Sequence, residues 1–138
     1  MLVTDGNGLP LGLLVESANE AEISLAEDTL ATIEVPQRRG RPKTRPREVV
    51  ADKAYDKWLF REKLRWRGIH PCIPERRGKK PRPGPQINLD SYGERWHVER
   101  SFAWLQNFRR LVVRYERSAR MFEAFVLVAF VLICLRQF

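Results

Sequence analysis

The chain has 138 residues, of which 43% are apolar and 30% charged, a length and balance that fit one compact domain and exclude collagen-like, mucin-like and wholly disordered chains. Its formal net charge of +8 is unevenly distributed, because the first 35 residues hold seven acids and no basic residue, which leaves +15 on residues 36–138. Such a basic region favours a polyanionic partner, nucleic acid before an anionic membrane surface.

The N-terminal third is predicted to form a hairpin followed by a helix. Residues 1–4 and 11–17 suit two strands, and the glycines and asparagine of residues 5–8 tolerate the positive φ of a tight turn. A capping-box-like start at Asn19 predicts a helix over residues 20–33 with one buried face.

Helices and strands alternate in the middle of the chain, which indicates an α/β sheet. After a proline-rich basic segment at residues 36–47, residues 48–52 form a short apolar run that ends in a carboxylate and is predicted to be a central strand. Residues 57–67 favour a helix and residues 69–73 a further strand, whereas the glycines and prolines of residues 75–90 exclude regular structure.

The C-terminal part is predicted to be helical. From Ser91 onward there is no proline and, after Gly93, no glycine, so two long helices fit, with a break near residues 117–120. The most apolar stretch, residues 121–135, is shorter than the roughly 20 residues that span a bilayer, and it contains Glu123. We interpret it as a buried core helix.

Glu99 lies on one face of the first of these helices. At 100° per residue, the side chains within about 60° of it are Tyr92, Arg95, Phe102, Ala103, Gln106 and Arg110. The opposite face collects Trp104, Leu105, Phe108, Leu111 and Val112, with His97 and Ser101. An apolar stripe of this kind packs on a sheet and would hold Glu99 rigidly as a metal ligand or general base. The alternative is a solvated Glu paired with Arg95 or Arg100.

Cysteine usage and the N-terminus indicate a reducing compartment. Cys72 and Cys134 stand in no Cys-x-x-Cys or Cys/His pattern, so neither a disulfide nor a structural zinc is expected. The N-terminus lacks the basic and apolar regions of a signal peptide. We therefore expect a cytoplasmic protein that is not associated with a membrane.

Two spaced blocks of sequence are specific enough to indicate a family. The first is Val49-Val50-Ala51-Asp52-Lys53-Ala54-Tyr55-Asp56, and the second is Tyr92-x2-Arg95-x3-Glu99, which runs on to Phe108-Arg109-Arg110-Leu111. Together they resemble the catalytic part of bacterial insertion-sequence transposases, most closely insertion sequence family five of the DDE superfamily. Residues 5–11 and 68–74 also resemble blocks of that family, so the resemblance covers most of the chain.

The resemblance implies an α/β fold of the RNase H-like type and a single catalytic-domain fragment over residues 1–138. It implies DNA transposition, in which water cleaves a phosphodiester and the freed 3′ hydroxyl attacks a target strand. Two Mg²⁺ ions, with Mn²⁺ as a substitute, serve such an in-line displacement, and carboxylates suit them. Asp52 matches the second Asp of the family's triad and Glu99 its Glu, so both are the expected catalytic and metal-binding residues. Asp56 is a weaker candidate for such a carboxylate, and we interpret it instead as a cap of the helix over residues 57–67.

Two departures from the family pattern matter. The first Asp of the triad lies upstream of the segment with which this chain starts, so the fold and the triad are expected to be incomplete here. Members of this group are often made from two overlapping frames, which implies an upstream transposase half as a partner and inactivity of the chain alone. Gln106 also stands where many relatives have a Lys, and it offers no cation.

Basic loops are the expected DNA contacts. Six of the ten residues 38–47 and five of the seven residues 76–82 are basic. The predicted DNA-binding residues are Arg38, Arg39, Arg41, Lys43, Arg76, Arg77, Lys79, Lys80, Tyr92, Arg95, Gln106, Arg109 and Arg110. The partners implied are double-stranded transposon-end and target DNA at the nucleoid, with a homodimer as the active assembly.

Residues 39–42, Arg-Gly-Arg-Pro, resemble the core of minor-groove AT-hook peptides, and contact with phosphates without sequence preference is the alternative. For the chain as a whole, two further interpretations stay open. One is a non-catalytic DNA-binding remnant of a transposase, and the other is a basic RNA-binding protein with a helical core.

Overall fold

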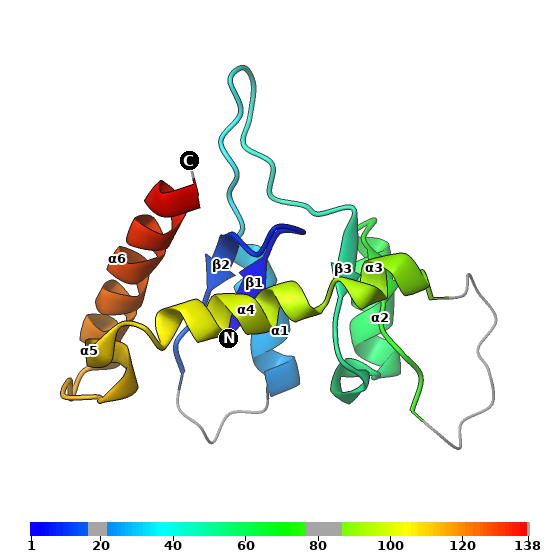
Figure 1. Cartoon of the computed structure of the whole chain (residues 1–138). Helices are drawn as coiled ribbons and strands as arrows, with labels where there is room; N and C mark the ends of the chain where they lie inside the picture. Colours follow the sequence, from blue (N-terminus) through cyan, green and yellow to red (C-terminus); the bar gives the residue numbers. More distant parts are fainter. Residues whose placement is uncertain (17–21, 77–86, 138) are drawn as a thin grey trace. The chain divides into compact units, whose positions relative to one another are not determined.

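The helices and strands of the computed structural model fall into two units of the chain (Figure 1). The structure describes residues 1–16, 22–76 and 87–137. One unit, here called the hairpin unit, consists of Met1–Val35 and Trp96–Phe138. The other, here called the parallel-strand unit, is Pro36–Arg95. Both units contain strands and helices, which confirms a mixed α/β architecture.

An antiparallel pair of strands opens the hairpin unit. β1 (Leu2–Thr4) pairs with β2 (Pro10–Leu13). The Asp5 carboxylate closes the turn between them, because it accepts hydrogen bonds from the main-chain N–H groups of Asn7 at 2.9 Å and Leu9 at 2.8 Å. The predicted hairpin is confirmed, although its second strand ends four residues earlier than the sequence indicated.

The helices of the hairpin unit are α1 (Glu22–Ala31), α4 (Trp96–Leu105), α5 (Arg109–Val112) and α6 (Ala119–Gln137). The predicted helix over residues 20–33 is thus present, while its expected cap, Asn19, lies outside the described residues. The buried core consists of Leu2, Val126, Phe130 and Ile133, and the partly buried side chains against it are Leu13, Val98, Trp104, Leu105, Phe108, Leu111 and Phe122. β1, α4, α5 and α6 therefore share one core.

The inner side of α4 holds the hairpin turn. The hydroxyl of Ser101, which is fully buried, lies 2.5 Å from the carbonyl oxygen of Gly8 and 2.9 Å from that of His97. Arg100 donates a hydrogen bond to the carbonyl oxygen of Asn7. In Figure 1, α4 crosses the β1–β2 hairpin. One face of α4 is therefore fixed to the hairpin.

The parallel-strand unit is a strand-helix-strand arrangement. β3 (Glu48–Val50) runs parallel to β4 (His70–Cys72), and α2 (Trp58–Trp66) connects them. A 3-10 turn, η1 (Lys53–Tyr55), follows β3, and α3 (Leu89–Gly93) ends the unit. The side chains buried between helix and strands are Phe60, Leu64, Ile69, Cys72 and Ile73. The predicted strands and helix are confirmed, with strands shorter than expected, but among the described strands β3 pairs with β4 alone, so its predicted central position is not confirmed.

A buried ion pair lies beneath η1. The Asp56 carboxylate accepts a hydrogen bond from Arg61 Nε at 2.9 Å, and their side chains are 0% and 8% exposed. A second nitrogen of Arg61 donates to the carbonyl oxygen of Ile73 at 2.5 Å. The expectation that Asp56 caps the following helix is wrong, because Lys57 occupies the cap position without a side-chain bond and Asp56 turns inward to Arg61.

The prediction of one long helix starting at Ser91 is wrong. The chain instead forms three short helices, α3, α4 and α5, the first of which begins two residues earlier. Phe108 is extended, with φ −94° and ψ 99°, and separates α4 from α5. This break keeps Phe108 and Leu111 packed on the core of the hairpin unit.

The apolar helix α6 is buried on one face only. Val126, Ala129, Phe130 and Ile133 are buried, but the side chains exposed on the other face are Met121, Leu127, Val128, Val131, Leu132 and Leu135. The expectation of a fully buried core helix is therefore only partly confirmed. No helix in the described part of the chain combines the length and apolar character that a membrane span requires.

Arg61→Met is expected to destabilise the parallel-strand unit strongly. The substitution leaves the Asp56 carboxylate buried without its cation, which costs about 3–5 kcal/mol of unfolding free energy. Urea denaturation followed by circular dichroism measures the loss. The matched control is Arg65→Met, one turn further along α2, whose ion pair with Glu62 is partly exposed and should cost no more than about 1 kcal/mol. Equal losses in the two variants would contradict the assignment.

Gly12→Ala is expected to strain the contact between β2 and α1. A Cβ at Gly12 would lie 2.7 Å from Thr32 Oγ1 and 2.9 Å from the carbonyl oxygen of Thr29, so the helix must shift at a cost of about 1–3 kcal/mol. Thermal unfolding measures the effect. Gly93→Ala serves as the control, because nothing lies within 4 Å of its added Cβ, and a loss of stability there would show that the effect is not steric.

Candidate active site

Asp52 lies two residues beyond the end of β3, at the start of η1. It has the extended backbone of a cap residue, with φ −67° and ψ 158°, and its Oδ1 accepts a hydrogen bond from the Ala54 N–H at 3.0 Å. Its other oxygen, Oδ2, lies 3.9 Å from Arg95 Nη1, and the side chain is 43% exposed. One oxygen of Asp52 is thus held by its own turn, while the second lies beside a cation in a partly exposed side chain.

Arg95 is placed by α3. The Asn88 side chain caps this helix by accepting from the N–H groups of Asp90 at 3.1 Å and Ser91 at 3.3 Å. The Asn88 carbonyl oxygen in turn accepts from the Cys72 thiol at 3.5 Å, which joins α3 to the end of β4. The sequence predicted Arg95 as a DNA-binding residue but did not predict that it faces Asp52.

Cys72 is not a candidate nucleophile. It is fully buried at the end of β4. Burial raises the pKa of its thiol, and the nearby Glu48 carboxylate adds to this effect. The thiolate is therefore disfavoured, and Cys72 acts as a small apolar core residue.

Glu99 lies on the exposed face of α4. Phe102, Ala103 and Gln106 on the same face are exposed too, whereas Ser101 is buried on the opposite side. This arrangement confirms the two predicted faces of the helix. Glu99 stands within α4, which Figure 1 shows as one regular helix.

Arg100, the other predicted neighbour of Glu99, is engaged by two tryptophans. Its guanidinium carbon lies 4.6 Å from the ring centroid of Trp96 and 4.8 Å from that of Trp104, in cation–π geometry. Trp96 also stacks on His97, with 4.0 Å between ring centroids. These stacked side chains support α4 on the side that faces the hairpin turn.

The predicted pair, Asp52 and Glu99, offers carboxylate oxygens, which are the hard donors that Mg²⁺ prefers. The donor chemistry of the two side chains therefore suits a divalent ion. Asp52 belongs to the parallel-strand unit and Glu99 to the hairpin unit, and the boundary between the units falls after Arg95. Within the described ranges, no three His, Cys, Asp or Glu side chains are grouped so that they could hold a metal ion.

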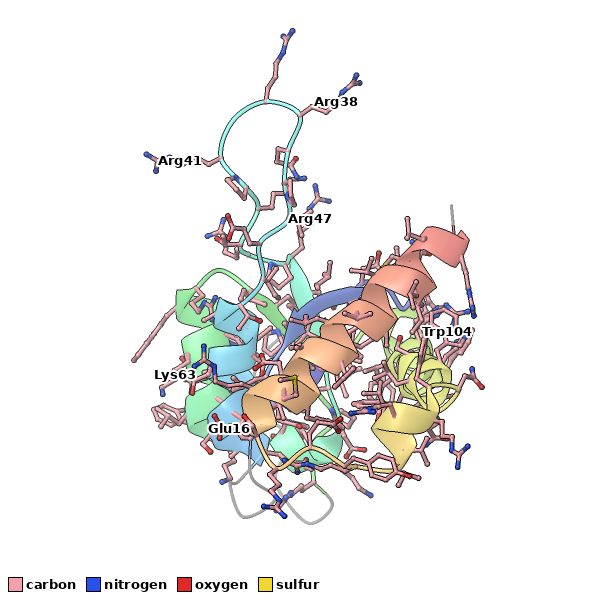
Figure 2. The ribbon with its side chains drawn as sticks, turned by 90° about the vertical axis from the view of Figure 1, so that its left-hand side faces the viewer. Glu16, Arg38, Arg41, Arg47, Lys63 and Trp104 are labelled. Atoms are coloured by element: carbon pink, nitrogen blue, oxygen red, sulfur yellow. The ribbon has the colours of Figure 1, made fainter. Side chains whose placement is uncertain are left out.

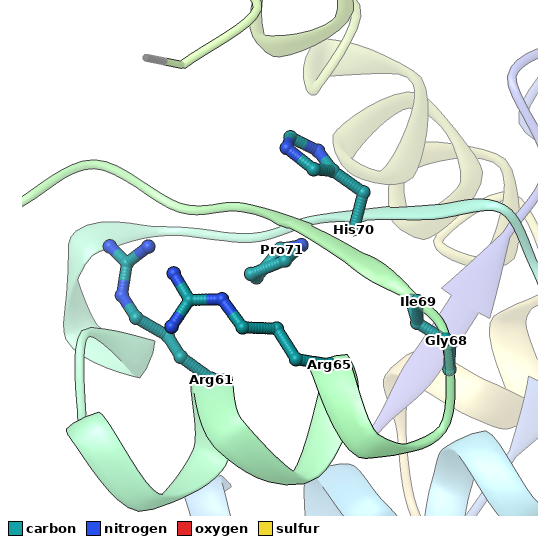
Figure 3. Close-up of a pocket in the computed structure, with 6 residues that line it drawn as sticks. All are labelled: Arg61, Arg65, Gly68, Ile69, His70 and Pro71. Atoms are coloured by element: carbon teal, nitrogen blue, oxygen red, sulfur yellow. The ribbon is translucent and has the colours of Figure 1, made fainter. Parts of the chain in front are cut away.

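A cavity of about 320 Å³ lies between α2 and β4, away from Asp52. Figure 3 shows Arg61 and Arg65 side by side on α2, with Pro71 of β4 beside them. Its lining residues are Arg61, Arg65, Gly68, Ile69, His70 and Pro71. Each basic side chain has an acidic partner, since Arg61 pairs with Asp56, Arg65 with Glu62 and His70 with Glu48. The cavity therefore carries little excess charge, and it holds none of the predicted catalytic residues.

The first basic loop is fully presented to solvent. Arg38, Arg39, Arg41 and Lys43 are all exposed, and Figure 2 shows Arg38 and Arg41 pointing away from the ribbon at the outer end of the loop. Gly40 has φ +90°, so the chain turns at this point. These four exposed side chains are therefore accessible to a polyanion.

The other predicted DNA contacts differ in their surroundings. Arg76 donates to main-chain carbonyl oxygens of η1, and Arg110 donates to Glu116 Oε1 at 2.7 Å. Arg109 and Gln106 are exposed, and Tyr92 is partly buried. The remaining three, Arg77, Lys79 and Lys80, lie outside the described residues.

Comparisons with known proteins cover nearly the whole chain. A family model described as "Transposase DDE domain" matches residues 1–134. The chain is 40% identical over 134 residues, or 96% of its length, to a protein of Burkholderia cepacia named "Putative transposase for insertion sequence element IS402". It spans 60% of the length of that relative. The comparison with solved structures gives no significant match. The resemblance read from the two sequence blocks is confirmed, and the chain belongs to the DDE transposase domain family of insertion sequences.

Proposed function

We propose that the chain is the part of an insertion-sequence transposase that contributes the second Asp and the Glu of the catalytic triad on an RNase H-like fold. The observation that carries this proposal is the Asp52 carboxylate, which stands at the matched motif position just beyond β3. One of its oxygens is held by the Ala54 N–H, and the other lies 3.9 Å from Arg95 in a side chain that is 43% exposed. A carboxylate whose orientation is fixed by a hydrogen bond suits a metal ligand.

Each site residue has a distinct task in the proposed reaction. Asp52 and Glu99 would hold the divalent ions, Mg²⁺ or Mn²⁺, which when bound stabilise the entering and leaving oxygens of phosphodiester cleavage. Arg95, 3.9 Å from Asp52, orients the open carboxylate oxygen and adds positive charge where a DNA phosphate approaches. The exposed basic loop at residues 36–47 holds the duplex through phosphate contacts.

The complete activity is proposed to need more polypeptide than this chain. The similar protein of Burkholderia cepacia is longer than this chain, which spans 60% of its length. We infer that an upstream transposase half supplies the first Asp of the triad, and that the active assembly on DNA is a homodimer. By this account the isolated chain binds DNA but does not cleave it.

Asp52→Asn and Glu99→Gln are each expected to abolish DNA nicking. Both substitutions keep the shape of the side chain but remove the anionic ligand, so the rate should fall about a thousandfold or more. The measurement is Mg²⁺- or Mn²⁺-dependent nicking of terminal inverted repeats by the chain mixed with the upstream half. Glu94→Gln, at an exposed acid five residues before Glu99, is the matched control and should nick normally.

The outcome of this experiment separates the three interpretations of the chain. Nicking that survives in both variants would rule out Asp52 and Glu99 as the catalytic pair. A wild-type mixture that binds duplex DNA without nicking it would indicate a non-catalytic remnant. Preference for structured RNA over duplex DNA would indicate an RNA-binding protein.

Replacing Arg38, Arg39 and Arg41 by Gln is expected to weaken duplex binding and its salt dependence. Each lost phosphate contact should reduce the slope of log affinity against log salt by about 0.9, measured by fluorescence anisotropy between about 50 and 200 mM salt. Arg65→Gln, which removes a cation already paired with Glu62, is the control. Because the chain turns at Gly40, we expect equal losses on A·T-rich and G·C-rich duplexes. A loss confined to A·T-rich DNA would instead support the minor-groove alternative.

A further inference from the structure

We propose that Arg76 is a positioning residue that fixes the Asp52 carboxylate by gripping the turn of residues 52–56, with the buried Asp56–Arg61 pair as its anchor. The proposal rests on the proposed function, because it takes Asp52 as a metal ligand. It gives a role to the buried pair of Asp56 and Arg61, and it assigns Arg76, predicted from the sequence as a DNA contact, to the turn instead.

The turn that carries Asp52 is too short to hold its own shape. It contains two main-chain hydrogen bonds, from the Tyr55 N–H to the Asp52 carbonyl oxygen at 2.9 Å and from the Asp56 N–H to that of Lys53 at 3.1 Å. A single 3-10 turn of this kind has poor hydrogen-bond geometry and is not stable by itself. The shape of the turn, and with it the position of the Ala54 N–H that holds Asp52 Oδ1, therefore depends on contacts from outside the turn.

Asp56 provides the first of these contacts at the far end of the turn. Its Oδ1 accepts from Arg61 Nε at 2.9 Å, and its Oδ2 accepts from the main-chain N–H of Arg76 at 3.0 Å. Arg61 also donates to the carbonyl oxygen of Ile73, just after β4. One buried carboxylate thus joins the turn to α2 and to the segment that follows β4.

Arg76 provides the second contact, along the outer side of the turn. Its Nε lies 3.3 Å from the carbonyl oxygen of Lys53 and its Nη2 lies 3.4 Å from that of Ala54. These bonds are long, but the planar guanidinium makes both at once from two nitrogens held in a rigid fork, a geometry that the flexible side chain of Lys does not preserve. Lys53 and Ala54 directly follow Asp52, so the grip limits rotation of the peptide whose N–H binds Asp52 Oδ1.

The two arginines around Asp52 then have complementary effects. Arg95 approaches the open Oδ2, whereas Arg76 acts on the main chain behind Oδ1. Metal affinity commonly falls 10–100-fold when a group that orients a ligand is removed. Because the Arg76 guanidinium is directed at its own main chain, its loss should affect metal binding more than DNA binding.

Arg76→Lys tests this inference, because it keeps the positive charge but loses the paired contact. In the mixture with the upstream half and terminal-repeat DNA, we expect the Mn²⁺ concentration for half-maximal nicking to rise about tenfold. Mn²⁺ binding measured by electron paramagnetic resonance on the same mixture should weaken by the same factor. Duplex affinity and its salt slope should stay unchanged. Arg65→Lys, an exposed arginine of α2 that does not touch the turn, is the control.

Two further variants, Arg76→Gln and Asp52→Asn, distinguish the possible outcomes of this test. Arg76→Gln, measured below its melting temperature, should weaken Mn²⁺ binding at least as much as Arg76→Lys. Unchanged Mn²⁺ dependence in Arg76→Lys, with loss in Asp52→Asn, would overturn the positioning role and leave the proposed function standing. Unchanged Mn²⁺ binding in Asp52→Asn would overturn the proposed function itself. Reduced duplex affinity as the only effect of both Arg76 variants would make Arg76 a DNA contact instead.

Discussion

The ion pair between Asp56 and Arg61 is the interaction on which the geometry around Asp52 depends. Removing two charges from water is costly, so a buried pair of this kind adds little net stability compared with apolar residues of similar volume. The pair instead fixes the orientation of the turn, because the Asp56 carboxylate accepts hydrogen bonds only from donors placed at its two oxygens. Those donors come from α2 and from the main chain after β4. A turn that follows a three-residue strand thereby acquires a defined position.

The spacing of residues along the sequence predicted those features that depend only on neighbouring residues. The helix predicted over residues 57–67 is Trp58–Trp66, and Gly68 ends it with φ +70°, because glycine adopts this backbone without strain. The two faces of α4 follow from its period in the same way. The prediction of a single long helix was wrong because the packing of Phe108 and Leu111 on the core outweighs the continuity of the helix. No local signal in the sequence indicates that contact.

Motif spacing singled out Asp52 and Glu99 as candidates, but the surroundings of Asp52 depend on residues far along the chain. Asp56 and Arg76 are 20 residues apart, and Asp52 and Arg95 are 43 apart, so helical or strand periodicity cannot predict these contacts. Charge counting fails for a related reason. The same guanidinium can bind a phosphate or its own chain, and Arg76 and Arg110 do the latter while Arg38 and Arg41 are exposed.

Short strands explain why each unit relies on side chains rather than on its sheet. Each described sheet has two strands of three or four residues, and isolated pairs of this size are marginally stable in water. In the hairpin unit, β1 is held by the apolar core that α6 completes. In the parallel-strand unit, the corresponding support at the end of β3 is polar and directional. A carboxylate proposed as a metal ligand benefits from the second kind, because hydrogen bonds are directional whereas apolar contacts are not.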